Sequence, residues 1–147
     1  MSRSSCLAFT VGGLALAGLA AGGVVLVNSD WLARKAGAAW DITYEATAGQ
    51  TGTPRATDVH YGHNPDRSDS AYKKETTGPV SLPWKKTVFV RVGEQARVEV
   101  LPAGNAKAEC RILLDGVRVV AEGTSPGPGR PAVCEVATSG TPGKWPR

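Results

Sequence analysis

The chain has 147 residues, and its 17 lysines and arginines against 13 aspartates and glutamates give a net charge of +4. This small, evenly mixed charge argues against a nucleic-acid-binding surface, so no nucleic-acid partner is expected. Roughly 120 residues follow the first apolar stretch, which is enough for one domain with its own hydrophobic core.

An apolar stretch without a charge runs from Cys6 to Val27. As a helix it would be about 33 Å long, close to the roughly 30 Å hydrocarbon core of a bilayer. We therefore expect a cytoplasmic N-terminus at residues 1–5, a single transmembrane helix at 6–27 and a juxtamembrane tether at 28–39. The alternative is a signal peptide cleaved after Ala15-Leu16-Ala17. The apolar run continues well past this site, which favours an anchor retained in the cell membrane.

Membrane lipid is accordingly an expected partner of the apolar helix. Two lysine pairs, Lys73-Lys74 and Lys85-Lys86, are further candidates for contact with anionic lipid headgroups. The alternative is that both pairs are solvated strand ends, which is the more common situation and the one we favour.

Two of the three cysteines, Cys110 and Cys134, lie in the part of the chain that follows the apolar stretch. No C-x-x-C pair is present, so zinc coordination is poorly supported. In a domain outside the membrane, a disulfide is the natural state of such a pair. We expect a Cys110–Cys134 bridge that contributes roughly 3 kcal/mol of stability, with the C-terminal domain extracytoplasmic.

After the tether, apolar and polar residues alternate with a period of two, which is typical of half-buried β-strands. Ile42, Tyr44 and Ala46 share one face of the first strand, and a second strand is expected at about 56–61. The polar stretch 62–79, interrupted by Asn-Pro and Gly-Pro, predicts a long loop or an excursion at a sheet edge.

The strand pattern returns after Trp84, which is a candidate for core packing. Asp115-Gly116 lies between two apolar runs and predicts a two-residue hairpin turn, because both central residues of a type I′ turn need positive φ. A returning strand at 117–121 and a last strand at 132–137 follow, and the Gly/Pro-rich tail 138–147 is expected to be disordered. Alternate positions that share a strand face are Val88, Val90 and Val92, then Ala96, Val98 and Val100, then Cys110, Ile112 and Leu114.

About seven short strands between residues 40 and 137 predict an all-β domain, which we interpret as an immunoglobulin-like β-sandwich. No segment after the tether has a convincing helical period. A small β-barrel is the alternative that the pattern leaves open.

The best candidate for a chemical site is Asp58-x-His60-x-x-His63-x-x-Asp66-x-x-Asp69, because imidazole and carboxylate groups bind divalent cations. The chain has only two histidines, however, and the segment is typical of a solvated loop. No G-x-S-x-G elbow and no Gly-rich loop that opens a helix are present. We therefore expect no catalytic residue, no metal site and no cofactor, and we do not expect an enzyme.

The order of these features resembles the mycobacterial membrane protein small (MmpS) family and its actinobacterial relatives. The similarity covers nearly the whole chain, and the CRIxxDG…C element is its most specific part. It implies an extracytoplasmic β-sandwich that assists MmpL proteins, the large RND-type transporters that export lipids and siderophores. The polar stretch 60–79 and the Pro/Gly-rich loop before Cys134 depart from the family pattern, which leaves the transporter and the cargo open. The residues that carry the resemblance are Ile42-Thr43-Tyr44-Glu45, Leu82-Pro83-Trp84, Cys110-Arg111-Ile112, Asp115-Gly116 and Cys134.

Three functions compete on these observations. The first, which we favour, is an accessory subunit whose partner is an MmpL-like RND transporter. The second is a free-standing cell-surface module that binds a ligand or an adhesin through loops such as 62–79. The third is a tethered metal-dependent hydrolase built on His60 and His63.

Overall fold

The computed structural model describes residues 39–49 and 54–140. The expected cytoplasmic N-terminus, the transmembrane helix and the tether up to residue 38 lie outside these residues, as do residues 141–147 of the expected tail. Within the described ranges, no helix is long and apolar enough to cross a bilayer.

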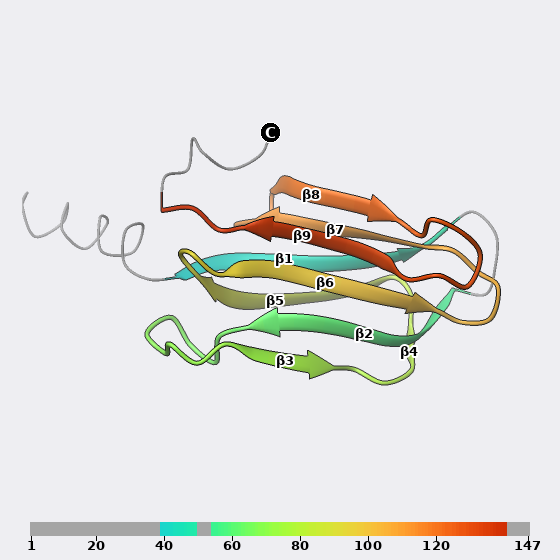
Figure 1. Cartoon of the computed structure of the whole chain (residues 1–147), viewed down its shortest axis with the longest axis horizontal. Helices are drawn as coiled ribbons and strands as arrows, with labels where there is room; N and C mark the ends of the chain where they lie inside the picture. Colours follow the sequence, from blue (N-terminus) through green and yellow to red (C-terminus); the bar gives the residue numbers. More distant parts are fainter. Residues whose placement is uncertain (1–38, 50–53, 141–147) are drawn as a thin grey trace, which may run out of the picture. The chain divides into compact units, whose positions relative to one another are not determined.

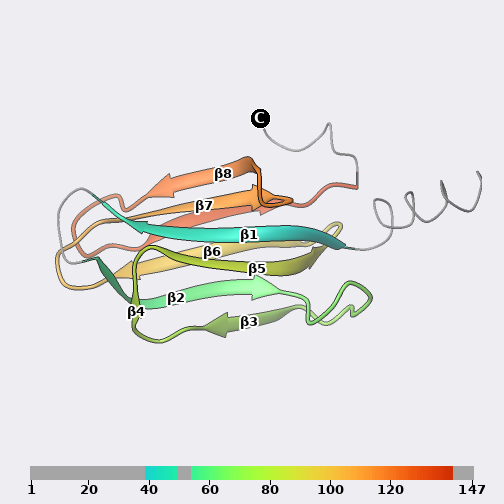
Figure 2. The same cartoon turned by 180° about the vertical axis from the view of Figure 1, so that it is seen from behind.

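The described residues form nine β-strands in two antiparallel sheets (Figures 1 and 2), which confirms the all-β prediction for this part of the chain. The four-stranded sheet has the order β5-β1-β7-β8. The five-stranded sheet has the order β3-β2-β6-β9, with β4 paired to β2. The strands are β1 (Ala39–Ala48), β2 (Arg55–His63), β3 (Lys73–Thr76), β4 (Val80–Ser81), β5 (Trp84–Arg91), β6 (Gln95–Pro102), β7 (Ala108–Leu114), β8 (Arg118–Thr124) and β9 (Ala132–Ala137).

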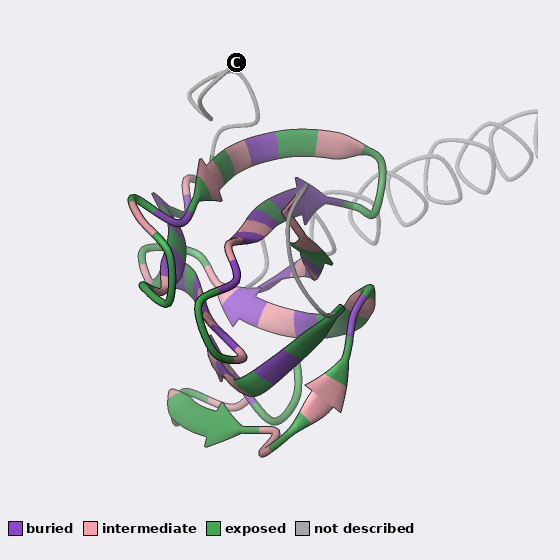
Figure 3. Cartoon of the chain, turned by 90° about the vertical axis from the view of Figure 1, so that its right-hand side faces the viewer, coloured by how far each residue is buried: buried purple, intermediate pink, exposed green. Residues whose placement is uncertain are grey.

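The two sheets pack face to face because each presents a row of apolar side chains to the other. Ile42 and Tyr44 in β1 are fully buried, and so are Val98 and Val100 in β6. All four belong to one hydrophobic cluster with members from both sheets. Figure 3 shows buried and exposed positions alternating along the strands, as expected where one face of a sheet is covered.

Local patterns predicted the turn and the last strand well. Asp115 and Gly116 have φ angles of 52° and 72°, which confirms the positive φ expected at both positions. The turn is one residue longer than predicted, because the last strand pair is Leu114 and Arg118. Strand β9 covers the predicted residues 132–137. Val92 differs from the expectation, because it lies in the turn after β5 and is exposed instead of sharing the buried face of Val88 and Val90.

The strand order departs from that of an immunoglobulin domain. In an immunoglobulin constant domain, the first strand lies at the edge of its sheet. Here β1 lies between β5 and β7, and it is hydrogen-bonded to both along most of its length. The similarity to that fold is therefore one of layers and not of connectivity.

The polar stretch 62–79 is more ordered than a plain loop. Its residues 73–76 form β3, the edge strand of the five-stranded sheet, which agrees with the expected excursion at a sheet edge. The tryptophan in the core is Trp40, which is buried, whereas Trp84 packs against the core from a partly buried position. A strand pattern alone does not separate these two positions, because both residues lie at the start of a strand, within its first two residues.

The end of the domain at which β1 begins is held together by side chains. We call it the proximal end and define it by residues 64–72, 92–94, 115–117 and 138–140. Asn64 is 1% exposed and joins the loop 64–72 to the end of β5. Its backbone N–H donates to the Phe89 carbonyl at 2.8 Å, its Oδ1 accepts from the Arg91 N–H at 2.9 Å, and its Nδ2 donates to the carbonyls of Asp69 and Ala71 at 3.3 and 3.2 Å.

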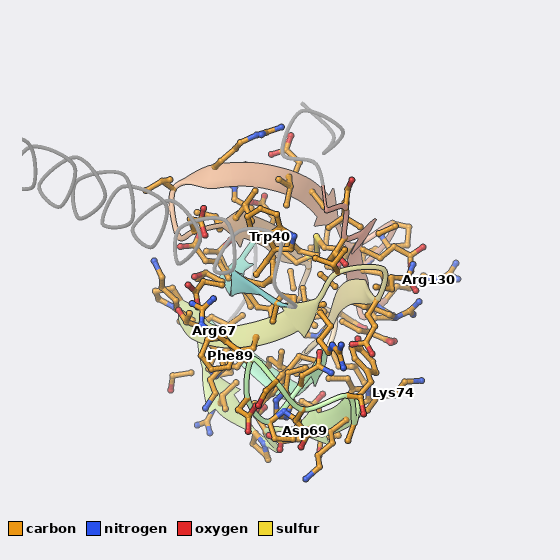
Figure 4. The ribbon with its side chains drawn as sticks, turned by 90° about the vertical axis from the view of Figure 1, so that its left-hand side faces the viewer. Trp40, Arg67, Asp69, Lys74, Phe89 and Arg130 are labelled. Atoms are coloured by element: carbon orange, nitrogen blue, oxygen red, sulfur yellow. A yellow bond between two sulfur atoms is a disulfide. The ribbon has the colours of Figure 1, made fainter. Side chains whose placement is uncertain are left out.

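Arg67 fixes the middle of the same loop to the start of β1. Its guanidinium pairs with the Asp41 carboxylate and donates to the Ala39 carbonyl at 3.2 Å. It also lies 4.8 Å from the centre of the Phe89 ring, a cation–π contact that Figure 4 shows from this end. The loop that the sequence describes as solvated is thus clamped across the proximal end.

The first residues of the expected tail also belong to the folded domain. Thr138 is buried, and its hydroxyl lies 2.6 Å from the Arg91 carbonyl oxygen and 2.8 Å from that of Glu94. The carbonyl of Ser139 accepts a hydrogen bond of 2.9 Å from the Trp40 indole. The order of the domain therefore extends past β9.

Candidate functional site

Cys110 and Cys134 form a disulfide that joins β7 of one sheet to β9 of the other. Their Cα atoms are 6.0 Å apart, and both residues are 2% exposed. Gly123 of β8 packs directly over the bridge, because a Cβ there would lie 3.3 Å from Cys134 Sγ and 3.5 Å from Cys110 Sγ. The bridge is buried and closes the sandwich at the β8–β9 side, so its role in this structure is to hold the two sheets together.

The residues of the candidate segment 58–69 do not come together as one site. Asp58 and His60 lie next to each other on β2, with His60 Nε2 3.2 Å from Asp58 Oδ2. Asp66 instead caps its own loop, where its Oδ1 accepts from the Ser68 N–H and hydroxyl, both at 2.7 Å. Asp69 accepts from the Ala71 N–H at 2.8 Å.

His63 is paired with a residue that the segment does not contain. Its Nε2 lies 3.0 Å from Glu75 Oε1 on β3, and its Nδ1 lies 3.1 Å from the Asn64 carbonyl oxygen. No group of three or more histidine, cysteine or carboxylate side chains within residues 39–49 and 54–140 is arranged to hold a metal ion. The alternation of β2 separates the two histidines, because His60 faces outward and His63 lies beside the edge strand.

Glu75 also accepts a hydrogen bond of 2.7 Å from the Tyr61 hydroxyl. Burial raises the pKa of Tyr61 to about 12, and the neighbouring Glu75 carboxylate adds to this shift. The Tyr61 hydrogen bond, followed by the contact with His63, holds the pKa of Glu75 below its usual value. This cluster ties β3 to β2 and explains why a strand of four exposed residues stays paired.

Tyr44, a tyrosine from the opposite sheet, inserts its hydroxyl between β2 and β6 where their pairing ends. The β2–β6 ladder ends at the pair Tyr61 and Val98, and the hydroxyl of Tyr44 takes up the next position. This hydroxyl donates to the Gly62 carbonyl at 2.8 Å and accepts from the Arg97 N–H at 3.2 Å. Burial is the main reason why the pKa of Tyr44 lies well above its usual range. The two strands therefore separate at Gly62 without leaving these backbone groups unsatisfied.

The separation opens a hollow on the outer face of the five-stranded sheet, with a volume of about 440 Å³. Gly62 forms part of its floor, and Tyr72 lies over this glycine, because a Cβ there would be 1.7 Å from the Tyr72 hydroxyl oxygen. The Tyr72 hydroxyl donates to the Gln95 carbonyl at 2.6 Å. The other lining residues are His60, Tyr61, Lys74, Arg97 and Glu99.

Most of the charges around this hollow are paired with one another. Arg97 donates to Glu135 at 2.9 Å and lies 3.5 Å from Glu99. His60 is next to Asp58, whereas Lys74 forms no ion pair with any described residue. Among the seven lining residues there is no serine, threonine or cysteine with a base beside it. The arrangement presents hydrogen-bonding groups and aromatic rings at the surface.

Sequence reasoning found the bridge and missed the hollow. The one local signal was Gly62 inside a strand pattern, because glycine in a strand often marks the close approach of another group. The partner of that glycine, Tyr72, lies ten residues further on in a polar stretch, and nothing local indicates that it folds back over β2. No family model, no characterised protein and no solved structure matches the chain.

Proposed function

We propose that this chain is a single-span, membrane-anchored accessory protein of an RND-type, MmpL-like transporter that assists the export of lipids or siderophore-like molecules. The observation that carries the proposal is the order of two parts along the chain. A 22-residue apolar stretch comes first, and a two-sheet domain closed by a buried disulfide follows it. A buried bridge between the sheets is typical of domains that work in an oxidising compartment, outside the cytoplasm.

The residues that carry the family resemblance have structural roles in this domain. Cys110 and Cys134 form the bridge, and Asp115-Gly116 forms the hairpin between β7 and β8. These residues support a shared β-sandwich architecture, and they leave the cargo undefined. The accessory role then requires no chemistry from the chain, only a tether, a rigid domain and a surface for the transporter.

Purification of the full chain in mild detergent tests this proposal. We expect it to elute together with a multi-span RND protein, whereas a monodisperse chain without such a partner would contradict the accessory role. A useful control is Cys6→Ser, which removes a cysteine outside the domain and should leave the complex unchanged. The variant Cys110→Ser/Cys134→Ser should lose the partner in proportion to the loss of folded domain.

A free-standing cell-surface binding module is the second candidate, and the hollow beside Tyr72 favours it. A module of this kind would use the hollow directly and would need no transporter. Cleavage after Ala17 with release of the domain into the medium would support this candidate. Recovery of the intact chain from the membrane fraction would support the first.

A further inference from the structure

The end of the domain opposite to the proximal end is closed by hydrogen bonds between loops. We call it the distal platform and define it by Arg55 and the loops 103–107 and 125–131. The Gly129 N–H donates to the Ala106 carbonyl at 2.8 Å, which joins the two loops directly. Figure 3 looks onto this end and shows that its loops are largely exposed.

Further bonds fix both loops to the strands below them. The Ser125 N–H donates to the Ala108 carbonyl at 2.9 Å, and the Ala108 N–H donates back to the Ser125 hydroxyl at 2.8 Å. Ser125 itself is buried. The Lys107 carbonyl accepts from the Gly49 N–H at 2.8 Å, so the end of β1 is tied in as well. The backbone of the platform is therefore positioned before any partner binds.

The platform carries three cations, Arg55, Lys107 and Arg130, and neither an aspartate nor a glutamate. Arg55 and Arg130 are exposed and Lys107 is half-buried. None of the three forms an ion pair with a residue that the structure describes. The Ala103 N–H donates to the Arg55 carbonyl at 3.1 Å, which places Arg55 beside the loop of Lys107. Figure 4 shows Arg130 at the periphery of the domain.

The proximal end differs in its charges. Its four segments contain the carboxylates of Asp66, Asp69, Glu94 and Asp115, and their one cation, Arg67, is paired with Asp41 of β1. Three further cations, Lys73, Arg91 and Arg118, directly flank these segments, so the proximal end carries charges of both signs. The distal platform contains no carboxylate, and a local excess of positive charge attracts and orients an acidic partner.

We propose that the distal platform binds a carboxylate-rich surface of a partner protein. This inference gives the surface and the partner chemistry of the proposed accessory role, and it rests on that role. Three cations on a backbone that is held in place, in loops that contain no carboxylate, match a cluster of aspartates and glutamates. Because the loops are already held in place, little conformational entropy is lost when they bind.

Other classes of partner fit this platform less well. A bilayer surface is bound by cations together with large apolar or aromatic side chains that enter the interface, and the platform has none. Single-stranded nucleic acid is bound by cations together with aromatic rings on which bases stack, and the platform lacks these too.

The test uses the full chain in nanodiscs of neutral lipid and a fluorescent poly-glutamate peptide as the probe. We expect Arg55→Glu/Lys107→Glu/Arg130→Glu to weaken peptide binding roughly tenfold, the change expected from the loss of about three exposed ion pairs. The matched control is Lys73→Glu/Lys86→Glu/Arg111→Glu, which makes the same change in net charge at exposed strand positions outside the platform and the hollow, and it should alter binding less than about twofold.

Several results would overturn the proposal. These are no binding by the wild-type chain, an equal loss in the control variant, or tighter platform-dependent binding to anionic vesicles or single-stranded DNA than to the peptide. The milder variant Arg55→Gln/Arg130→Gln covers the case in which charge reversal prevents folding, and it should weaken binding in the same direction.

Co-purification with the RND transporter separates this inference from the accessory role. If the wild-type chain retains the transporter and the platform variant loses it, both are supported. If the platform variant and the control variant both retain the transporter, the platform inference fails and the accessory role stands. If the wild-type chain brings down no transporter but still binds the peptide through the platform, the accessory role fails and the acidic-partner chemistry stands.

Discussion

The proximal and distal ends of the domain are closed in different ways. At the proximal end, side chains hold the loops together. Asn64 binds β5 and its own loop, Arg67 binds the start of β1, and Thr138 binds the end of β5 and the turn after it. At the distal end, backbone groups and the Ser125 hydroxyl hold the loops, and the cationic side chains remain unpaired with described residues.

This difference shows that the polar side chains serve different purposes at the two ends. The proximal side chains are used within the domain, so changes there should act mainly on stability. The distal cations contribute little to the fold, so changes there should act mainly on binding. The comparison separates residues that build the domain from residues that are available to a partner, and each prediction below tests one side of it.

Loss of the disulfide should have the largest effect. The bridge lies two residues from the start of both β7 and β9, so it supports the two loops of the distal platform. We expect Cys110→Ser/Cys134→Ser to lower the free energy of unfolding by about 2–5 kcal/mol. Hydrogen exchange should rise first in 103–107 and 125–131. An unchanged melting temperature with and without reductant would contradict this role.

Asn64→Ala should be the most damaging change at the proximal end. It removes three side-chain hydrogen bonds of a buried residue and leaves the half-buried Arg91 N–H without its partner. We expect a loss of about 2–3 kcal/mol in chemical denaturation. Asn105→Ala, an exposed asparagine of the distal platform, is the matched control and should cost less than about 0.5 kcal/mol. Equal losses in the two variants would remove the distinction between the ends.

Ser125→Ala tests the distal closure at a smaller scale. The change leaves the Ala108 N–H without the hydroxyl that it now donates to, in a buried position. We expect a loss of about 1–2 kcal/mol, measured by thermal unfolding. Ser70→Ala, an exposed serine of the proximal loop, should be nearly neutral. If Ser125→Ala is also neutral, the distal loops are held in another way.

Acid should loosen the proximal end before the distal platform. Hydrogen bonds from the Ser68 hydroxyl and then its N–H hold the pKa of Asp66 below its usual value. A depressed pKa means that the stabilisation is present above the unfolded pKa and is lost as pH falls through the folded value, here below about pH 4. Hydrogen exchange in 64–72 should therefore rise at a higher pH than in 103–107 and 125–131, which contain no carboxylate. A simultaneous rise in all three segments would contradict the comparison.

The sequence predicted those features that depend on local chemistry. The alternation in β6, the Asp115-Gly116 turn and the last strand follow from side-chain period and from the φ angles that the residues allow. The disulfide could also be predicted without knowledge of the fold, because it required only two cysteines in the same domain and an oxidising compartment. Local patterns do not state which strands become neighbours, so the internal position of β1 was not foreseen.

The hollow and the proximal clamp depend on contacts between distant residues. Tyr72 folds back over Gly62, and Arg67 returns to Asp41, and both come from a stretch that looks like solvated loop. A polar stretch is a weak predictor of tertiary contacts, because the same polar residues can be solvated in a loop or can form hydrogen bonds and ion pairs with other strands. The sequence already argues against the metal candidate, and the structure places its residues apart: His60 and His63 are three positions apart on β2 and therefore face opposite sides of the sheet.

Intact-mass spectrometry of the natively expressed chain, extracted from membranes without reductant, tests the central claim most directly. The account predicts an uncleaved N-terminal stretch and a mass lowered by the two hydrogens lost when Cys110 and Cys134 join. A mature chain that begins at Gly18, or free thiols at both cysteines, would contradict a bridged domain anchored outside the cytoplasm.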